Sequence, residues 1–255
     1  MEKQFNPFSL ENKTILITGA SSGIGRQCAI DCNRMGAKVV CMGRNEERLR
    51  ETLSQMEGEG NAMYSYDFSQ VDGIKELVSQ IVSERGKLDG LVCAAGIEKS
   101  APFKLLTPSD YEDILRVNTI SAFEIVRQFT GVKSIKTPAS VVFISSITSV
   151  IARTSTAAYS ASKGALVSGA RVFAAELAKR KIRVNCISPG TILTPLMQNY
   201  LSGLSEEDYK KRVSGFPLGL GETTDVSSAC IYLLSDASRW VTAQNFIIDG
   251  GYTAI

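Results

Sequence analysis

The sequence predicts an α/β fold in which one doubly wound parallel sheet of about seven strands carries helices on both faces. Short apolar runs rich in β-branched residues alternate with helix-patterned stretches along the whole chain. Such runs are typical of parallel strands that are buried on both faces. The first run passes directly into a glycine-rich turn and a helix, and no repeat, low-complexity tract or linker divides the 255 residues. We therefore expect residues 1–255 to form a single domain.

Charge and hydropathy narrow the classes of partner. The formal net charge is +2, which gives no argument for nucleic acid or an anionic membrane. No segment approaches the ~18 uncharged apolar residues of a membrane span. The N-terminal stretch also lacks the apolar core of a signal peptide. We therefore expect a cytoplasmic protein with no nucleic-acid or membrane partner.

Cysteine and histidine usage narrows the chemistry. The six cysteines are scattered without C-x-x-C spacing, which is typical of reduced thiols in the cytoplasm. Cys28 and Cys32 are four apart on a predicted helix, but a zinc site there would need all its ligands from cysteine and carboxylate. The chain contains no histidine, which argues against serine–histidine hydrolases and histidine-ligated catalytic metals. No metal is expected.

The predicted elements alternate in chain order. Strands are expected over Thr14–Ile17, Lys38–Met42, Ala62–Tyr66, Leu88–Cys93, Val141–Ile144, Ile182–Ile187 and Asn245–Ile248. Helices are expected from the glycine-rich turn to about Met35, then over Glu46–Met56, Val71–Arg85, Pro108–Lys133, from near Ala157, and over Thr224–Ser235. In open sheets of this kind, ligands bind at the carboxyl ends of the strands, so the residues that follow each strand are the candidates for function.

The turn after the first strand is the first candidate. It contains Gly19, Gly23 and Gly25, with Ser21, Ser22 and Ile24 between them, in the spacing G-x-x-x-G-x-G. Glycines let the backbone approach a pyrophosphate, and the following helix offers free N–H groups and the positive end of its dipole. A plain strand–helix turn with glycines for tight packing is the alternative. The order strand, turn, helix favours nucleotide binding.

Arg44 follows the second strand. A fold of this kind that uses NAD normally has an acidic residue here for the ribose 2′-hydroxyl. Residues 39–45 contain none, and Arg44 can pair with a 2′-phosphate instead. The sequence thus favours NADP(H) over NAD(H). The alternative is that Arg44 belongs to the charged face of the next helix.

Three further candidate functional positions precede the fifth strand. Asp67-Phe68 ends the third strand, and Ala94-Ala95-Gly96 ends the fourth with side chains small enough for a ring to lie against the backbone. Asn118 is polar among apolar residues of the Pro108–Lys133 stretch, and a buried asparagine must be hydrogen-bonded. Its role is either structural or to hold a water beside Lys163.

A serine, a tyrosine and a lysine form a candidate proton-transfer unit. Ser146 follows the fifth strand, and Tyr159 and Lys163 are four apart on the next helix, where they share a face. A lysine cation there favours phenolate and is expected to lower the pKa of Tyr159 from about 10. Ser146 could hold a carbonyl oxygen while Tyr159 gives or takes the proton. The alternative is a purely structural pair, with Tyr159 buried at the end of the helix and Lys163 extending its side chain towards solvent.

The C-terminal part contains a segment that could cover a bound substrate. Pro189-Gly190 ends the sixth strand, and the polar, partly helical excursion Thr191–Phe216 is placed to act as a lid over a substrate. The Tyr159 helix carries many glycines and alanines, which allow close approach of a neighbouring element, from the same chain or from a second subunit.

Taken together, these motifs resemble the short-chain dehydrogenase/reductase superfamily over about Leu10–Tyr252. The glycine turn, Asp67-Phe68, and Asn118, Ser146, Tyr159 and Lys163 match, with Ser146 and Tyr159 thirteen residues apart as in the family. The resemblance implies a Rossmann fold and hydride transfer between NADP(H) and a carbonyl/alcohol pair. In it, Tyr159 is the general acid, Ser146 positions the substrate oxygen, Lys163 binds the nicotinamide ribose and Asn118 holds a water. Contacts with the cofactor are implied for Gly19, Ser21, Ser22, Gly23, Ile24, Gly25, Arg44, Asp67, Phe68, Ala94, Ala95, Gly96, Tyr159, Lys163, Pro189, Gly190, Ile192 and Thr194.

Two positions depart from the family pattern. The asparagine that usually opens the motif after the fourth strand is replaced by Cys93, which removes a hydrogen bond that supports the sheet. The usual T-G-Q near the end is Thr242-Ala243-Gln244, which touches a subunit contact. We expect function to survive both.

The sequence constrains the identity of the substrate less than that of the cofactor. Pro217-Leu218-Gly219 resembles 3-oxoacyl-acyl-carrier-protein reductases, which implies a carrier-protein or CoA thioester. Relatives that act on sugar acids, steroids or other secondary alcohols are the alternatives, and a non-catalytic NADP(H)-binding regulator is an alternative of another class. Lys210, Lys211 and Arg212 could form a basic patch for an acidic carrier protein, or an ordinary solvated helix face. The family resemblance also implies a homotetramer or homodimer.

Overall fold

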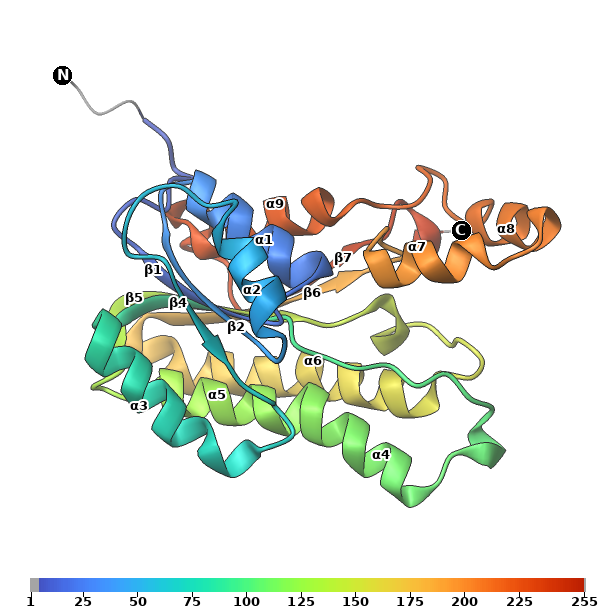
Figure 1. The fold of residues 1–255 in the computed structure, drawn as a ribbon, viewed down its shortest axis with the longest axis horizontal. Coiled ribbons are helices and arrows are strands. Elements are labelled where there is room, and N and C mark those ends of the chain that lie inside the picture. The colour runs from blue at the N-terminus through green and yellow to red at the C-terminus, as the bar shows by residue number, and fades with distance from the viewer. Residues whose placement is uncertain (1–4, 255) are drawn as a thin grey trace.

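Seven parallel strands form one sheet in the computed structural model, which describes residues 5–254 (Figure 1). Their order across the sheet is β3-β2-β1-β4-β5-β6-β7. The strands are β1 (Thr14–Thr18), β2 (Lys38–Gly43), β3 (Ala62–Ser65), β4 (Leu88–Cys93), β5 (Ile135–Ile144), β6 (Ile182–Pro189) and β7 (Asn245–Ile248). The predicted fold class is confirmed. Residues 1–4, part of the stretch in which no signal-peptide core is expected, lie outside the described residues.

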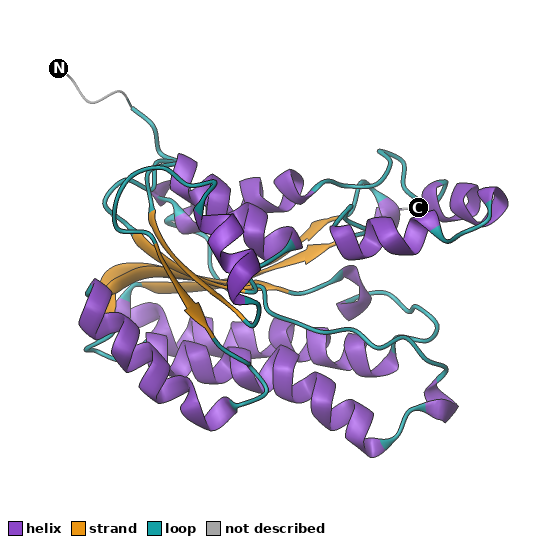
Figure 2. Ribbon diagram, viewed as in Figure 1, coloured by secondary structure: helices purple, strands orange, loops and turns teal. Residues whose placement is uncertain are grey.

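Helices cover both faces of the sheet, which lies between them in Figure 2. One face carries α1 (Gly23–Arg34), α2 (Glu46–Leu53) and α9 (Thr223–Leu234). The other carries α3 (Ile74–Arg85), α4 (Pro108–Leu115), α5 (Ser121–Phe129) and α6 (Ala157–Leu177). Two short helices, α7 (Pro195–Ser202) and α8 (Glu206–Val213), project beyond the ends of β6 and β7 (Figure 1).

The central strand shows how the sequence divides the core. Side chains alternate across a strand, so Leu16 packs into the core on the α3–α6 face while Ile15 and Ile17 pack into the core on the α1–α9 face. Strand β1 pairs with both β2 and β4, and the chain winds outward in opposite directions from these two neighbours. Ligands of open α/β sheets bind at such a reversal of strand order.

Two elements differ from the predictions. The predicted helix Pro108–Lys133 is interrupted by a π-helical turn at Arg116–Ile120 and ends at Phe129. Strand β5 begins at Ile135 instead of Val141, because Lys136, Thr137 and Pro138 are exposed and interrupt the apolar signal. Within the described part of the chain, no helix is long and apolar enough to cross a membrane.

Candidate active site

A single cavity of about 1100 Å³ lies at the carboxyl edge of the sheet and brings the predicted residues together. It is lined by residues that follow each of the seven strands, by the start of α6, and by the segment containing α7 and α8. All the predicted catalytic and cofactor-binding residues line it except Asn118. Segments that are far apart in the sequence thus converge on one space.

The glycine turn leaves this space open by excluding side chains. Gly19 has φ +71°, and a Cβ there would lie 2.8 Å from the carbonyl carbon of Ala94. A Cβ on Gly25 would collide with the carbonyl oxygen of Gly19. The Thr18 hydroxyl oxygen accepts hydrogen bonds from the backbone N–H groups of Ala94 (3.1 Å) and Ala95 (3.0 Å), so the loops after β1 and β4 are fixed together. Sequence reasoning did not single out that role of Thr18.

The start of α1 is open to an anion. Ser22 is its N-cap, and within residues 5–254 no side chain caps the first turn. The first backbone N–H groups of a helix have no partner inside the helix, and the dipole makes this end positive. Phosphate groups bind at helix ends of this kind.

The end of β2 is cationic. Arg44 and Arg48 line the cavity with Asn45 between Arg44 and the first turn of α2. A backbone hydrogen bond from Ser69 lowers the pKa of Asp67, and the positive charge of Arg44 lowers it further. The glycine cradle, the uncapped helix start and the two guanidinium groups together fit a dinucleotide that carries an extra phosphate.

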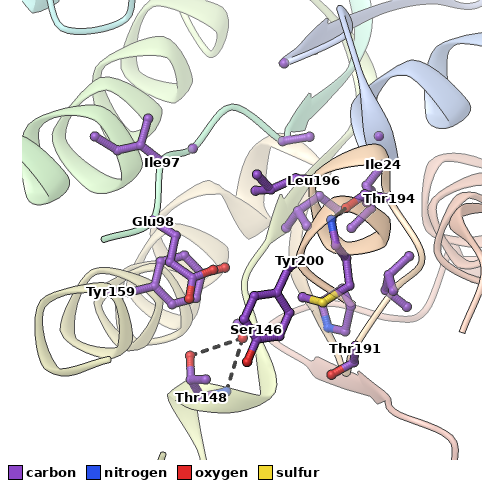
Figure 3. A pocket seen from close by; sticks show the side chains of 18 of the residues that line it. Ile24, Ile97, Glu98, Ser146, Thr148, Tyr159, Thr191, Thr194, Leu196 and Tyr200 are labelled. Carbon is purple, nitrogen blue, oxygen red and sulfur yellow. Dashed lines mark hydrogen bonds between the residues drawn. The ribbon is translucent and has the colours of Figure 1, made fainter. Parts of the chain in front are cut away.

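Ser146 faces the cavity with a proton to donate. Its hydroxyl oxygen accepts hydrogen bonds from the backbone N–H of Thr148 (3.2 Å) and from the Thr148 hydroxyl (3.1 Å), as Figure 3 shows. Because both bonds use acceptor lone pairs, the Ser146 hydrogen stays available for another oxygen. The hydroxyl of Ser145 instead donates to the carbonyl oxygen of Lys163 (2.9 Å), so it anchors α6.

The pKa of Tyr159 moves in the direction opposite to the prediction. Burial raises it, the Glu98 carboxylate raises it further, and the nearby Ser146 hydroxyl and Arg153 guanidinium only partly oppose the rise. Lys163 does not offset this, since its Nζ lies 5.6 Å from the ring centre and donates to the carbonyl oxygen of Ile144 (2.8 Å). Tyr159 is therefore protonated at neutral pH.

Lys163 is itself perturbed. Its side chain is almost fully buried, and burial lowers its pKa to about 8. Desolvation disfavours the charged form of any group that is moved out of water. The pKa of Lys163 is therefore close to neutral pH, and a small rise in pH changes its charge.

Asn118 positions the loop after β4. It is fully buried in the π-helical turn, and its side chain accepts a hydrogen bond from Ile97 N–H (2.8 Å) and donates to the Ile97 carbonyl (2.9 Å) and to the Ser162 hydroxyl (3.0 Å). A π-turn re-aims one side chain within a helix and is frequent at functional sites. The structural interpretation of Asn118 thus has direct support, and its role toward a water stays a prediction.

Several cavity residues were not predicted. Glu98 and Arg153 come from the loops after β4 and β5, and Tyr200 comes from α7. Figure 3 shows Glu98 beside the ring of Tyr159, with Tyr200 on the other side of Ser146. No sequence signal identifies them, because charged loop residues are ordinary at a surface.

The basic run of α8 divides into separate groups. Arg212 is half-buried, lies over the ring of Tyr200 at 5.9 Å, and donates to the Thr191 hydroxyl (3.4 Å). Lys210 and Lys211 are exposed, and Lys210 pairs with Glu206. The solvated-face interpretation therefore fits Lys210 and not Arg212.

Comparison with known proteins agrees with this geometry. A family model described as enoyl-(acyl carrier protein) reductase matches residues 19–253. The chain belongs to the short-chain dehydrogenase/reductase superfamily. It is 34% identical to glucose 1-dehydrogenase of Gluconobacter oxydans over 251 residues, which is 94% of this chain and 92% of that protein. It is 32% identical to a 3-oxoacyl-[acyl-carrier-protein] reductase of Thermotoga maritima over 245 residues, 95% and 98% of the two chains.

A solved structure gives the same fold. A Beutenbergia cavernae protein assigned as an NAD(P)-dependent gluconate 5-dehydrogenase, with bound NADP at low occupancy, superposes with a TM-score of 0.87. It is 30% identical and covers 98% of this chain and 100% of its own. Membership of the superfamily makes this protein an oxidoreductase of the class that interconverts alcohols and ketones.

Proposed function

We propose that this protein is an NADP(H)-dependent oxidoreductase that interconverts a ketone and a secondary alcohol, with Tyr159 as the general acid and base. The observation that carries the proposal is the convergence of Ser146, Tyr159 and Lys163 on one cavity with the glycine turn and Arg44. NADP rather than NAD is supported by the Arg44 and Arg48 guanidinium groups and by the lack of an acidic residue at 39–45.

The chain's own residues manage the proton and the substrate oxygen. Ser146 donates its free hydroxyl hydrogen to the carbonyl oxygen and holds it beside Tyr159. Tyr159, kept protonated by burial, gives its proton to that oxygen during reduction and takes it back during oxidation. Lys163 would hold the nicotinamide ribose, and Asn118 would hold the water of a proton relay. Bound NADP(H) would supply or accept the hydride.

The substrate proposal has two branches. The 3-oxoacyl-thioester branch is supported by the Thermotoga maritima relative, whose name gives that activity. The sugar-acid branch is supported by the Beutenbergia cavernae neighbour, which is assigned as a gluconate dehydrogenase, and by charged residues in the substrate part of the cavity. In both branches the segment Thr191–Phe216 acts as the lid, since its α7 and α8 side chains line the cavity.

We also propose a homotetramer or homodimer in the cytoplasm. Val172 on α6 and Ile120 beside α5 are exposed apolar side chains, and a Cβ added at Gly164 of α6 would meet no atom within 4 Å. These features leave room for a second subunit's helix. All six cysteines are free and buried, as expected in a reducing compartment.

Replacement of Tyr159 by phenylalanine tests the activity. The change removes the phenolic proton, so turnover of every ketone should fall by about 10²–10⁴-fold, while NADPH binding, measured by fluorescence, should stay close to wild type. Tyr64→Phe is the matched control, because Tyr64 lies at the far side of β3 and bonds to Glu84. A Tyr159→Phe enzyme with most of its rate would refute the proposed acid, and NADPH binding without any turnover in the wild type would favour the regulator.

A further inference from the structure

The guanidinium groups of Arg153 and Arg212 both lie in the substrate part of the cavity, and the Glu98 carboxylate in the same cavity forms an ion pair with neither. Arg153 and Arg212 both line the cavity that contains Ser146 and Tyr159. Neither forms an ion pair with any carboxylate of residues 5–254. The Nε of Arg212 is buried and, within the described chain, has no hydrogen-bond partner. A buried donor without a partner destabilises the folded protein, so its retention needs an explanation.

The two groups are close enough to repel each other. Burial lowers the pKa of Arg212, and the positive charge of Arg153 is the next cause of that shift. Arginine does not lose its proton in proteins, so the repulsion persists over the working pH range. An anion placed between the two groups would remove the repulsion and supply the missing acceptor for Arg212.

The location ties such an anion to the reaction. Arg153 acts electrostatically on Tyr159 as well as on Arg212, so its charge is near both the proposed acid and the lid helix α8. Arg212 is held in place by the ring of Tyr200 and by the Thr191 hydroxyl, both of which line the cavity. The anion site is therefore within the reach of a small molecule whose carbonyl lies at Ser146 and Tyr159.

We infer that the substrate is a small keto acid, or the matching hydroxy acid, whose carboxylate binds between Arg153 and Arg212. This inference rests on the proposed ketone–alcohol activity. Planar guanidinium groups match a carboxylate with two parallel N–H···O bonds. The positive charges of the two arginines favour an anionic ligand over an uncharged one, with Glu98 in the same cavity. A fully esterified or thioesterified acid would leave Arg212 without its acceptor.

The Glu98 carboxylate is free to accept hydrogen bonds from hydroxyl groups of such a substrate. Its carboxylate accepts a hydrogen bond from the Ser100 hydroxyl (3.1 Å) and has no ion pair within residues 5–254. A carboxylate can accept further hydrogen bonds from hydroxyl groups. The keto acid that fits best therefore also carries hydroxyl groups near its carbonyl, as a polyhydroxylated acid does.

The test compares a keto acid with an uncharged ketone of similar size, and with a phosphorylated and a thioesterified ketone. Wild-type enzyme with NADPH is assayed against 5-ketogluconate, the uncharged hexose fructose, fructose 6-phosphate and acetoacetyl-CoA. The keto acid should have a kcat/KM about 10–100-fold above that of fructose, as expected for charge-assisted hydrogen bonds. A faster reaction with the phosphate or the thioester, or no preference for the acid over fructose, would overturn the inference and leave the proposed activity intact.

Variants assign the effect to the two residues. Arg153→Gln and Arg212→Gln should each lower kcat/KM for the keto acid much more than kcat/KM for fructose, so that most of the preference for the keto acid is lost. Arg212→Lys should restore part of it, since it keeps the charge and loses the planar fork. Lys210→Gln, on the exposed side of the same helix, is the matched control and should change nothing. Normal NADPH binding shows that each variant is folded.

Binding separates the two proposals. Calorimetric titration of the Tyr159→Phe protein with 5-ketogluconate in the presence of NADPH measures affinity without turnover. Binding of the keto acid that is lost in the Tyr159→Phe/Arg212→Gln double variant supports the inference even if no ketone is ever reduced. Absence of keto-acid binding overturns it even if other ketones are reduced.

Discussion

The proposed cofactor and substrate halves of the cavity have walls built from different parts of the chain. In the cofactor half, the wall is mostly backbone: glycines at 19, 23 and 25, the uncapped start of α1 and the small residues after β4. In the substrate half, the wall is mostly side chains, including Glu98, Arg153 and Arg212, and they come from two loops and a lid helix. A dinucleotide thus meets a nearly fixed surface, whereas the substrate meets groups whose identity can change without a change of fold.

This difference sets the expected consequences of mutation. A change in the cofactor half should affect all substrates alike, because every reaction uses the same cofactor. A change in the substrate half should alter the ranking of substrates and leave cofactor binding alone. Lys163, proposed to hold the nicotinamide ribose beside Tyr159, lies where the two halves meet, whereas Glu98 belongs to the substrate half.

The largest effect on the choice of cofactor is expected for Arg44→Asp in the cofactor half. It replaces the proposed partner of the 2′-phosphate by a repelling carboxylate, so the NADPH-to-NADH ratio of kcat/KM should fall by about 10–100-fold for every substrate. Arg50→Asp is the control, because Arg50 is exposed on α2 and pairs with Glu46. An unchanged NADPH-to-NADH ratio would show that Arg44 does not contact the 2′-phosphate. A ratio that differed between substrates would contradict the division of the cavity into two independent halves.

Lys163→Met should stabilise the protein while it removes activity. The folded-state pKa of about 8 lies below the ordinary value of lysine. The charged lysine therefore destabilises the fold fully below about pH 8, and this penalty disappears as the pH rises toward 10. At pH 7 the variant should gain about 1–3 kcal/mol in the free energy of unfolding, less what the lost bond to the Ile144 carbonyl contributes.

Urea denaturation at pH 7 and pH 10 measures this gain. The advantage of Lys163→Met over wild type should shrink at the higher pH, because the wild-type lysine is then neutral. Lys179→Met, at an exposed position after α6, should show little change at either pH. A Lys163→Met protein less stable than wild type at pH 7 would show that hydrogen bonding outweighs desolvation.

The smallest effect is expected for Glu98→Gln. The Glu98 carboxylate raises the pKa of Tyr159, and oxidation of an alcohol needs Tyr159 without its proton. Removal of the negative charge should therefore move the rise of the oxidation rate to lower pH, while reduction at neutral pH changes little. Initial rates from pH 6 to pH 10 measure the shift, with Glu112→Gln on the exposed side of α4 as control. A profile that does not move would place Glu98 outside the reach of the acid.

Much of the cofactor half could be predicted because its signals are local. The glycine turn, the strand before it and the helix after it are contiguous, and a helix start binds phosphate wherever the chain folds this way. The spacing of Tyr159 and Lys163 is a property of one helix turn, so their shared face follows from periodicity alone. Strand positions were also predictable where both faces are buried, as in β1. The start of β5 was missed, because exposed residues 136–138 follow its first residue.

The sequence by itself determined the order of strands and helices, the phosphate-binding turn and the Ser146, Tyr159 and Lys163 set, since each depends on residues near one another in the chain. Only the tertiary structure decided the electrostatics. The pKa of Tyr159 rises because the effect of burial is larger than that of the distant Lys163 charge. The Asn118 side chain is hydrogen-bonded to Ile97 and Ser162. Only the fold brings Arg153 to Arg212, because desolvation and the approach of like charges depend on contacts between segments that no local pattern specifies.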